Sequence, residues 1–147
     1  MKVVIIAAGQ GSRLKSQTAN SPKTLLNING NPIIYKLLEN CILPEISGVI
    51  IVTGYQHQII EDYITNIDLD INIETIYNPN WKLENGLSIL SARDAIPSGE
   101  NFIVSMSDHY YGSDLLEIVV QSSLEDNIAT VGLDFNINNI FDIDDGM

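Results

Sequence analysis

The chain has 147 residues, of which 45% are hydrophobic, 19 are acidic and 7 are Lys or Arg, for a net charge of −12. This length allows one domain with its own apolar core, and the acidic balance argues against nucleic acid as a partner because phosphate backbones repel an acidic surface. The sequence has one cysteine, no apolar run long enough to span a bilayer and no signal pattern after its Met-Lys start, so we expect a cytoplasmic protein.

The first part of the chain is predicted to form a strand, a loop and a helix. Residues 2–6 are mostly β-branched and almost uniformly apolar, as in a strand that is buried on both faces, and a glycine-rich loop follows at once. After a short extended piece at residues 24–28, Asn31 is expected to cap a helix that has Pro32 at its first position. Helical spacing places the following residues on the buried face of that helix: Ile33, Ile34, Leu37, Leu38 and Cys41.

The rest of the chain repeats this alternation. Further strands are predicted at residues 48–52, 71–77, 102–106, 128–133 and 140–143. The helix after the second strand is predicted to bury Ile59, Ile60, Tyr63, Ile64 and Ile67. A later helix is predicted from near Gly86 through Leu87, Ile89, Leu90 and Ala95, and Ser113 is expected to cap one that carries Leu115, Leu116, Val119 and Val120. This order predicts an α/β fold with a largely parallel sheet, helices on both faces and ligands at the carboxyl ends of strands.

The loop after the first strand has the composition of a phosphate-binding loop. Gly9 and Gly11 let backbone N–H groups approach an anion, while Ser12, Arg13 and Lys23 supply a hydroxyl and two positive charges. The alternative is an ordinary glycine-rich turn with two surface cations. A nicotinamide-dependent oxidoreductase is disfavoured, because the dinucleotide fingerprint has a third glycine where this loop has leucine, and no acidic residue ends the second strand.

The charges are divided unevenly along the chain. Residues 1–40 hold five cations and one acid, for a net charge of +4, which leaves −16 for residues 41–147. A positive site in an acidic body suits a small polyanion such as a nucleoside triphosphate, and the surrounding acid favours a divalent cation. The alternative is that the few cations of an acidic protein cluster here without a function.

Two further segments carry candidate ligand-binding residues. Asp108 is the first acidic residue after an uncharged strand, so its carboxylate is a candidate Mg²⁺ ligand at the sheet edge, although it could instead cap a turn or pair with a cation. Asn85 and Gly86 lie at a predicted helix start, where amide groups can read a base edge, although an Asn-Gly turn is the simpler alternative. His57, His109 and Cys41 lack the spacing of a metal site, and no arrangement for covalent catalysis is present.

These segments together resemble the nucleotidyltransferases that activate sugar phosphates. Residues 7–14 followed by Pro22 and Lys23 match the Ala-Ala-Gly-x-Gly-Ser/Thr-Arg-Leu and Pro-Lys signature of that family. The Ser-Asp-His-Tyr-Tyr-Gly-Ser-Asp-Leu run is similar to the stretch whose first aspartate holds the metal, with Ser107 where the family usually has glycine. Residues 84–88 correspond to its base-recognising segment, and the motifs look most like those of inositol-1-phosphate cytidylyltransferases, then phosphocholine cytidylyltransferases.

The resemblance implies a three-layer, Rossmann-like (GT-A-like) fold, with residues 1–147 forming the nucleotide-binding part of a C-terminally truncated domain. It implies transfer of CMP from CTP to a sugar, polyol or choline phosphate, with release of pyrophosphate and with Mg²⁺ as cofactor. The alternative is a non-catalytic nucleotide-binding or regulatory module, or an inactive fragment of such an enzyme. The resemblance assigns catalysis to Arg13 and Lys23, the metal to Asp108, and nucleotide binding to Ala7, Ala8, Gly9, Gly11, Ser12, Asn85 and Gly86. The oligomeric state is not indicated.

Overall fold

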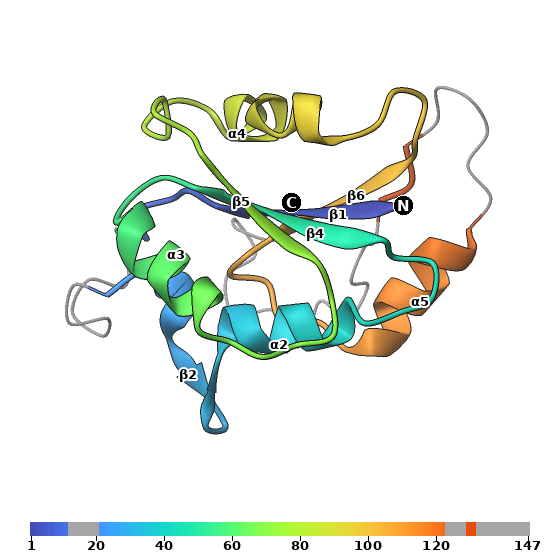
Figure 1. Ribbon diagram of the computed structural model, residues 1–147, viewed down its shortest axis with the longest axis horizontal. Helices are drawn as coiled ribbons and strands as arrows, with labels where there is room; N and C mark the ends of the chain where they lie inside the picture. Colours follow the sequence, from blue (N-terminus) through green and yellow to red (C-terminus); the bar gives the residue numbers. More distant parts are fainter. Residues whose placement is uncertain (12–20, 123–128, 132–147) are drawn as a thin grey trace, which may run out of the picture.

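The computed structural model describes residues 1–11, 21–122 and 129–131, which are built around a four-stranded sheet (Figure 1). The strands lie in the order β5-β4-β1-β6, and every neighbouring pair is parallel. Their bounds are β1 Lys2–Ala7, β4 Gly48–Thr53, β5 Ile73–Tyr77 and β6 Phe102–Met106. The predicted parallel α/β sheet is therefore confirmed, with β1 paired on both sides.

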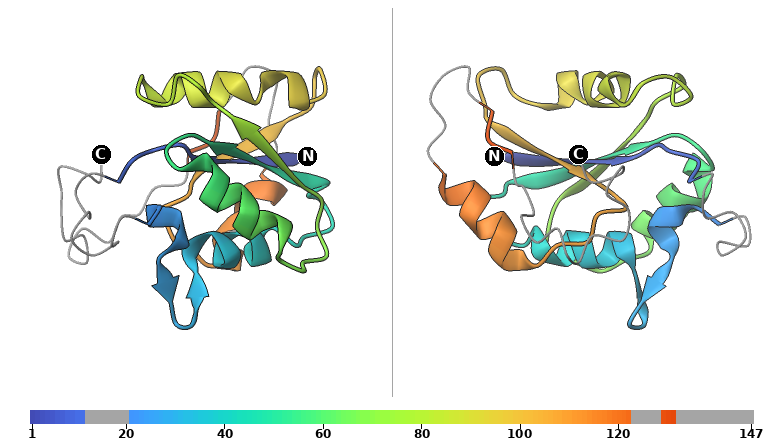
Figure 2. Two further views of the ribbon diagram at one scale, coloured as in Figure 1. Left: turned by 60° about the vertical axis from the view of Figure 1, so that its left-hand side comes forward. Right: turned by 180° about the vertical axis from the view of Figure 1, so that it is seen from behind.

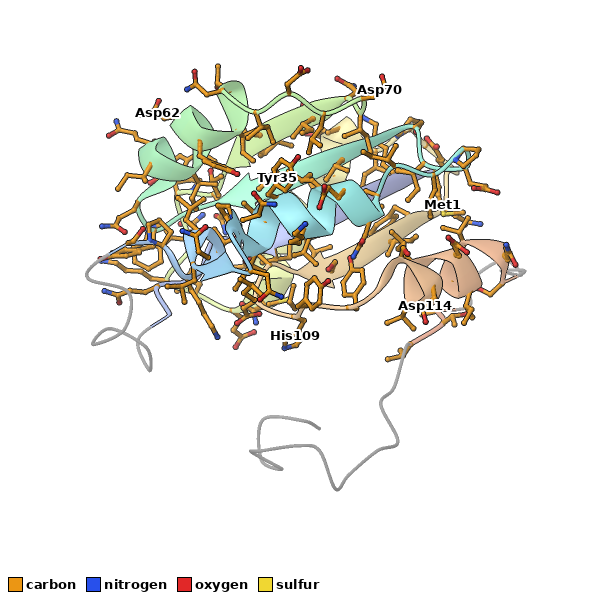
Figure 3. All side chains as sticks on the ribbon, turned by 90° about the horizontal axis from the view of Figure 1, so that it is seen from below. Met1, Tyr35, Asp62, Asp70, His109 and Asp114 are labelled. Carbon is orange, nitrogen blue, oxygen red and sulfur yellow. The ribbon has the colours of Figure 1, made fainter. Side chains whose placement is uncertain are left out.

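Helices cover both faces of the sheet, as predicted. The lower face in Figure 1 carries α2 (Ile33–Asn40), α3 (His57–Thr65) and α5 (Ser113–Gln121), which stand in front of the sheet when the molecule is seen from below in Figure 3. The upper face carries α4 (Asn85–Ser91) and the 3-10 helix η3 (Arg93–Ala95), as both views in Figure 2 show. The molecule thus has three layers. Among the described residues, none of the helices has the length and apolar character needed to cross a bilayer.

The core divides between the two faces because side chains alternate along each strand. Val3 and Ile5 of β1 point to the lower face, where they pack with α2, and Val4 and Ile6 point to the upper face, where they pack with Ala92. Of the residues predicted on the apolar face of the first helix, all five are buried: Ile33, Ile34, Leu37, Leu38 and Cys41. Periodicity therefore identified the main buried surface correctly.

The segment between the glycine loop and α2 differs from the prediction. Residues 24–28 were expected to be extended, but Lys23–Leu25 forms a 3-10 helix, η2, closed by a hydrogen bond from the Leu25 N–H to the Pro22 carbonyl. A small hairpin follows, with β2 at Asn27–Ile28 and β3 at Asn31–Pro32. Its turn places Asn29 and Gly30 at φ values of 51° and 91°, as a tight hairpin turn requires. Asn31 therefore pairs with Ile28 and does not cap α2.

The predictions for α3 and α4 were each wrong at one point. Ile59 is 46% exposed, because α3 turns Ile60 and Ile64 toward the sheet and Ile59 away from it. Leu90 is 60% exposed, and the helix predicted to reach Ala95 ends at Ser91 before η3. Tyr63 and Ile67, which were also predicted to be buried by α3, are partly exposed but pack against the lower core cluster.

The predictions for the C-terminal part of the chain concern the cap of α5 and two further strands. Ser113 is the first residue of α5 and makes no capping hydrogen bond through its side chain, since Gly112 holds the N-cap position. Residues 129–131 are not in a strand, and the remaining residues of the strands predicted at 128–133 and 140–143 lie outside the described part of the chain.

Candidate functional site

The glycine loop leaves the carboxyl end of β1 between its neighbouring strands. The Tyr55 N–H, just past β4, donates a hydrogen bond of 3.0 Å to the Ala8 carbonyl and so ties the loop to the sheet. Gly11 has a φ of +60°, and a Cβ atom there would lie 3.1 Å from the Cβ of Lys23. Another residue at this position would therefore be strained and crowded. Ser12 and Arg13 lie outside the described residues.

The loop, η2, the first residue of α4 and the end of β6 surround one pocket. Six of the predicted site residues line it. Its lining consists of Ile6, Ala7, Gly9, Gly11, Pro22, Lys23, Thr24, Asn85, Met106, Ser107 and Asp108. Two other predicted residues, Ala8 and Gly86, are absent from this lining, and Ala8 is almost completely buried behind the loop. Segments that are far apart in the sequence therefore meet where the motifs predicted a ligand.

An ion pair joins the two charged residues of this described lining. Lys23 Nζ lies 2.9 Å from Asp108 Oδ2, and the side chains are 32% and 33% exposed. The other carboxylate oxygen, Oδ1, is 3.9 Å from Nε2 of His109, whose ring is largely exposed at the edge of the molecule (Figure 3). Of the alternatives left open for Asp108, pairing with a cation is thus observed.

The backbone around Asp108 is fixed from both sides. The Ser107 N–H donates to the Ile6 carbonyl at 3.1 Å, which extends the pairing of β6 with β1 by one residue. The His109 N–H donates to the Met106 carbonyl at 3.2 Å and turns the chain immediately after the strand. Asp108 therefore sits at the apex of a short turn at the carboxyl edge, where its carboxylate faces Lys23.

Thr24 is a pocket residue that the sequence analysis did not identify. Its side chain is 3% exposed, and its hydroxyl oxygen has no hydrogen-bond partner among the described residues. A buried hydroxyl without a partner costs free energy, and the side chains of Gln56 and Tyr111, outside this lining, also carry a buried oxygen without a partner among the described residues. In the sequence, the only available signal was a small polar residue next to Lys23.

A second unpredicted residue, Asn78, connects α4 to the sheet. Its side chain is 2% exposed; Nδ2 donates to Ser88 Oγ at 3.1 Å, and Oδ1 accepts from the Asn80 N–H at 2.9 Å. Its own N–H donates to the Thr53 carbonyl at 2.9 Å. Asn78 thus fixes the helix that carries Asn85 against the ends of β4 and β5. An asparagine before proline at a strand end signalled only a turn.

The turn after β4 supports the loop and does not line the pocket. A Cβ atom on Gly54 would collide with the Cβ of Trp81 and would come within 2.7 Å of the Ala8 carbonyl oxygen. The rings of Tyr55 and Trp81 pack with centroids 5.5 Å apart. Only glycine allows the three segments to meet this closely.

The described residues offer little to a metal ion besides Asp108. No three His, Cys, Asp or Glu side chains of the described chain come together in a metal-binding group. His57 packs on Tyr77 and contacts Glu61 Oε2 at 3.2 Å, so it belongs to a separate cluster. Mg²⁺ needs only one or two carboxylates when substrate phosphates and water complete its shell, and Asp108 beside a phosphate-type loop fits that requirement. Cys41 is buried in the core, which raises the pKa of its thiol to about 12.

Comparison with known proteins identifies one matching family and several relatives that align with part of their length. The profile of the family described as nucleotidyl transferase matches residues 2–135. A glucose-1-phosphate cytidylyltransferase of Salmonella typhimurium is 32% identical over 57% of this chain and 33% of its own length. A bifunctional IPC transferase and DIPP synthase of Aquifex aeolicus is 32% identical over 80% of this chain and 27% of its own length.

Solved structures share the fold. The inositol-1-phosphate CTP transferase from T. maritima has a TM-score of 0.72 at 20% identity, covering 84% of this chain and 49% of its own. HddC from Yersinia pseudotuberculosis has a TM-score of 0.65 at 29% identity, covering 80% of this chain and 52% of its own. The chain therefore spans about half the length of these structures and a third or less of the two sequence relatives named above.

Proposed function

Because the chain belongs to the nucleotidyl transferase family, we propose that it provides the nucleotide site of an enzyme that transfers CMP from CTP to a sugar or polyol phosphate. The observation that carries this proposal is the pocket in which Gly9, Gly11, Lys23, Asn85 and Asp108 meet. Relatives named as cytidylyltransferases for glucose 1-phosphate and for choline phosphate favour cytosine as the base. A uridylyltransferase relative makes UTP the main competitor.

The reaction asks mainly for positioning and charge neutralisation. A phosphate oxygen of the acceptor forms a bond to the α-phosphorus of the nucleotide, and the bond from that phosphorus to the bridging oxygen breaks, which releases pyrophosphate. No covalent intermediate with the protein is needed, so well-placed donors and cations can supply the rate enhancement.

The phosphate-facing residues divide this work. Gly9 and Gly11 leave their N–H groups accessible to the triphosphate, since no side chain shields them. Lys23 neutralises charge at the α-phosphate and the incoming acceptor phosphate, and Arg13 stabilises the departing pyrophosphate. Ser12 adds a hydroxyl to the loop. The roles of Arg13 and Ser12 rest on the sequence motif.

The base and the metal are assigned to the other sides of the pocket. Ala7, Ala8, Asn85 and Gly86 hold the base, with the Asn85 amide able both to donate and to accept hydrogen bonds. Asp108 would hold Mg²⁺, which when bound would supply positive charge to the phosphate oxygens. Asp108 also keeps Lys23 within the pocket before substrate arrives.

The test is pyrophosphate release by the full chain in Mg²⁺. CTP, UTP, dTTP, ATP and GTP are each paired with inositol phosphate, phosphocholine and hexose phosphates, and CTP is expected to give the fastest release. Lys23→Ala and Arg13→Ala should each lower turnover by roughly a hundredfold, as removal of a transition-state charge partner does. Lys36→Ala, on the surface of α2, is the matched control. Silence of every pair while CTP still binds would favour a non-catalytic nucleotide-binding module.

A further inference from the structure

The two charged side chains in the described pocket lining neutralise each other. In the described lining, Lys23 is the cationic residue and Asp108 the anionic one, and their side chains are in contact at 2.9 Å. Lys23, which is proposed to bind phosphate, thus forms an ion pair with Asp108, which is proposed to bind the metal. Lys23 therefore competes with a metal ion for Oδ2 of this carboxylate, and Asp108 competes with a phosphate for the ammonium group.

We propose that Lys23 blocks metal binding at Asp108 until a triphosphate draws the lysine away, so that the nucleotide and the divalent cation enter as a coupled pair. This inference rests on the function proposed above and adds a rule for how its site is loaded. Free metal alone binds weakly because it competes with an ammonium group for one carboxylate. Free triphosphate alone binds weakly because its cation is held by Asp108.

The geometry gives Lys23 a short route between its two partners. The side chain lies against the glycine loop, since a Cβ on Gly11 would lie 3.1 Å from Lys23 Cβ and 3.6 Å from Lys23 Cδ. Lysine has a flexible stem with a compact charge, so rotation of its outer bonds can move the ammonium without moving η2. The backbone that carries the short Asp108 side chain, in contrast, is held by hydrogen bonds from the N–H groups of Ser107 and His109. The lysine is therefore the part that moves.

The linkage must act in both directions. If a triphosphate strengthens metal binding by freeing Asp108, metal must strengthen triphosphate binding by the same factor. Removing either member of the ion pair should therefore release the other for its own ligand. This prediction is specific to a competing pair, because loss of a merely structural contact would weaken both ligands.

Metal binding without nucleotide is the first test. Mn²⁺ is titrated into the full chain by electron paramagnetic resonance or calorimetry, and the site of interest is the one lost in Asp108→Asn. Lys23→Met should bind Mn²⁺ roughly tenfold more tightly at this site than wild type, within the range of measured coupling factors. Lys36→Met removes a lysine that pairs with Glu39 at 2.7 Å on α2, and it should leave this affinity unchanged.

Triphosphate binding without metal is the second test. In EDTA, Asp108→Asn should bind CTP several-fold more tightly than wild type, since Lys23 is then free for the phosphates. If Lys23→Met fails to tighten Mn²⁺ binding, or keeps the tighter binding when combined with Asp108→Asn, the proposal is wrong. An unchanged or weaker CTP affinity of Asp108→Asn in EDTA would also overturn it. Failure of wild type to bind any triphosphate, in contrast, would reject the proposed function, while the Mn²⁺ titrations still judge the ion pair.

Discussion

The two faces of the sheet bury very different numbers of apolar side chains, so the lower face is the thick face and the upper face the thin face. Below it, fifteen buried residues of the described chain form one cluster with α2, α3 and α5, whereas the cluster above it contains five: Val4, Ile6, Ile50, Val52 and Ala92. Large apolar side chains remain exposed on the upper side, including Leu90 of α4. Since apolar burial is the main source of folding free energy, the lower face supplies most of the stability.

Because of this difference, the part of the molecule that supplies most of the stability is not the part that carries Asn85 of the candidate site. The helix that carries Asn85 lies on the thin face, where the buried Asn78–Ser88 hydrogen bond holds it alongside a few apolar contacts. Elements with little apolar burial open locally more easily than the rest of a protein. We therefore expect α4 to be the least stable of the helices around the pocket, and the following substitutions test that expectation.

The largest effect is expected on the thick face. Leu37 of α2 is completely buried, so Leu37→Ala removes packed atoms and leaves a cavity. The free energy of unfolding should fall by about 2–5 kcal/mol, as measured by urea denaturation. A loss below about 1 kcal/mol would be smaller than the cost of a partly relaxed cavity. It would contradict the inference that the lower face supplies most of the stability.

A smaller but more local effect is expected at Asn78. Asn78→Ala leaves the buried Ser88 hydroxyl without its partner and removes the acceptor of the Asn80 N–H, which should cost about 1–3 kcal/mol. The amide hydrogens of α4 should exchange faster. Those of β1 and α2 should slow or accelerate only as much as the change in the global free energy of unfolding requires. A uniform loss of protection across all elements would show that α4 has no separate opening.

Alkaline pH is expected to weaken the thick face through Cys41. Burial raises the pKa of this thiol from 9.0 to about 12. Above pH 9 the unfolded chain loses a proton that the folded chain keeps, so this stabilising contribution is complete below pH 9 and is lost as the pH rises toward 12. Between pH 8 and 10, wild type should lose about 1 kcal/mol more stability than Cys41→Ala, measured by urea denaturation at each pH. Equal losses in the two proteins would contradict the burial of the thiol.

The smallest effect is expected for Leu90 on the thin face. Its side chain is 60% exposed on α4, so Leu90→Ser should change the free energy of unfolding by less than about 0.5 kcal/mol. Thermal denaturation beside Leu37→Ala gives the comparison directly. A loss as large as that of Leu37→Ala would mean that another surface covers α4 in solution.

Much of the fold was predictable because the strands and the α2 face follow simple periodicity. The four strands of the sheet are confirmed, since apolar runs, or alternation in the case of β5, are typical of strands in a covered sheet. The burial predicted for Ile59 was wrong because helical periodicity does not show whether a neighbouring element covers a given position. The hairpin that contains Asn31 was missed because an asparagine followed by a proline also fits the start of a helix.

The site was predictable as a set of residues but not as a set of contacts. The rule that ligands bind at the carboxyl ends of parallel strands pointed to Gly9 and Asp108, whereas Lys23 and Asn85 were named from their sequence motifs, and all four line one pocket. The direct pairing of Lys23 with Asp108 depends on the paths of two loops, which no local pattern specifies. Asn78 escaped notice for a related reason, since its partners become apparent only when α4 is placed over the sheet.

The central position of β1 also has a consequence for the order of folding. β1 pairs residue 2 with residue 48 in β4 but with residue 102 in β6, and the Lys23–Asp108 contact joins residues 85 apart in sequence. Closing the longer loop costs more chain entropy, so we expect β1 and β4 to associate before β6 joins them. Pulsed hydrogen exchange during refolding should then protect β4 before β6. A folding intermediate without β6 would already hold the basic loop on its sheet but would lack the carboxylate that neutralises it.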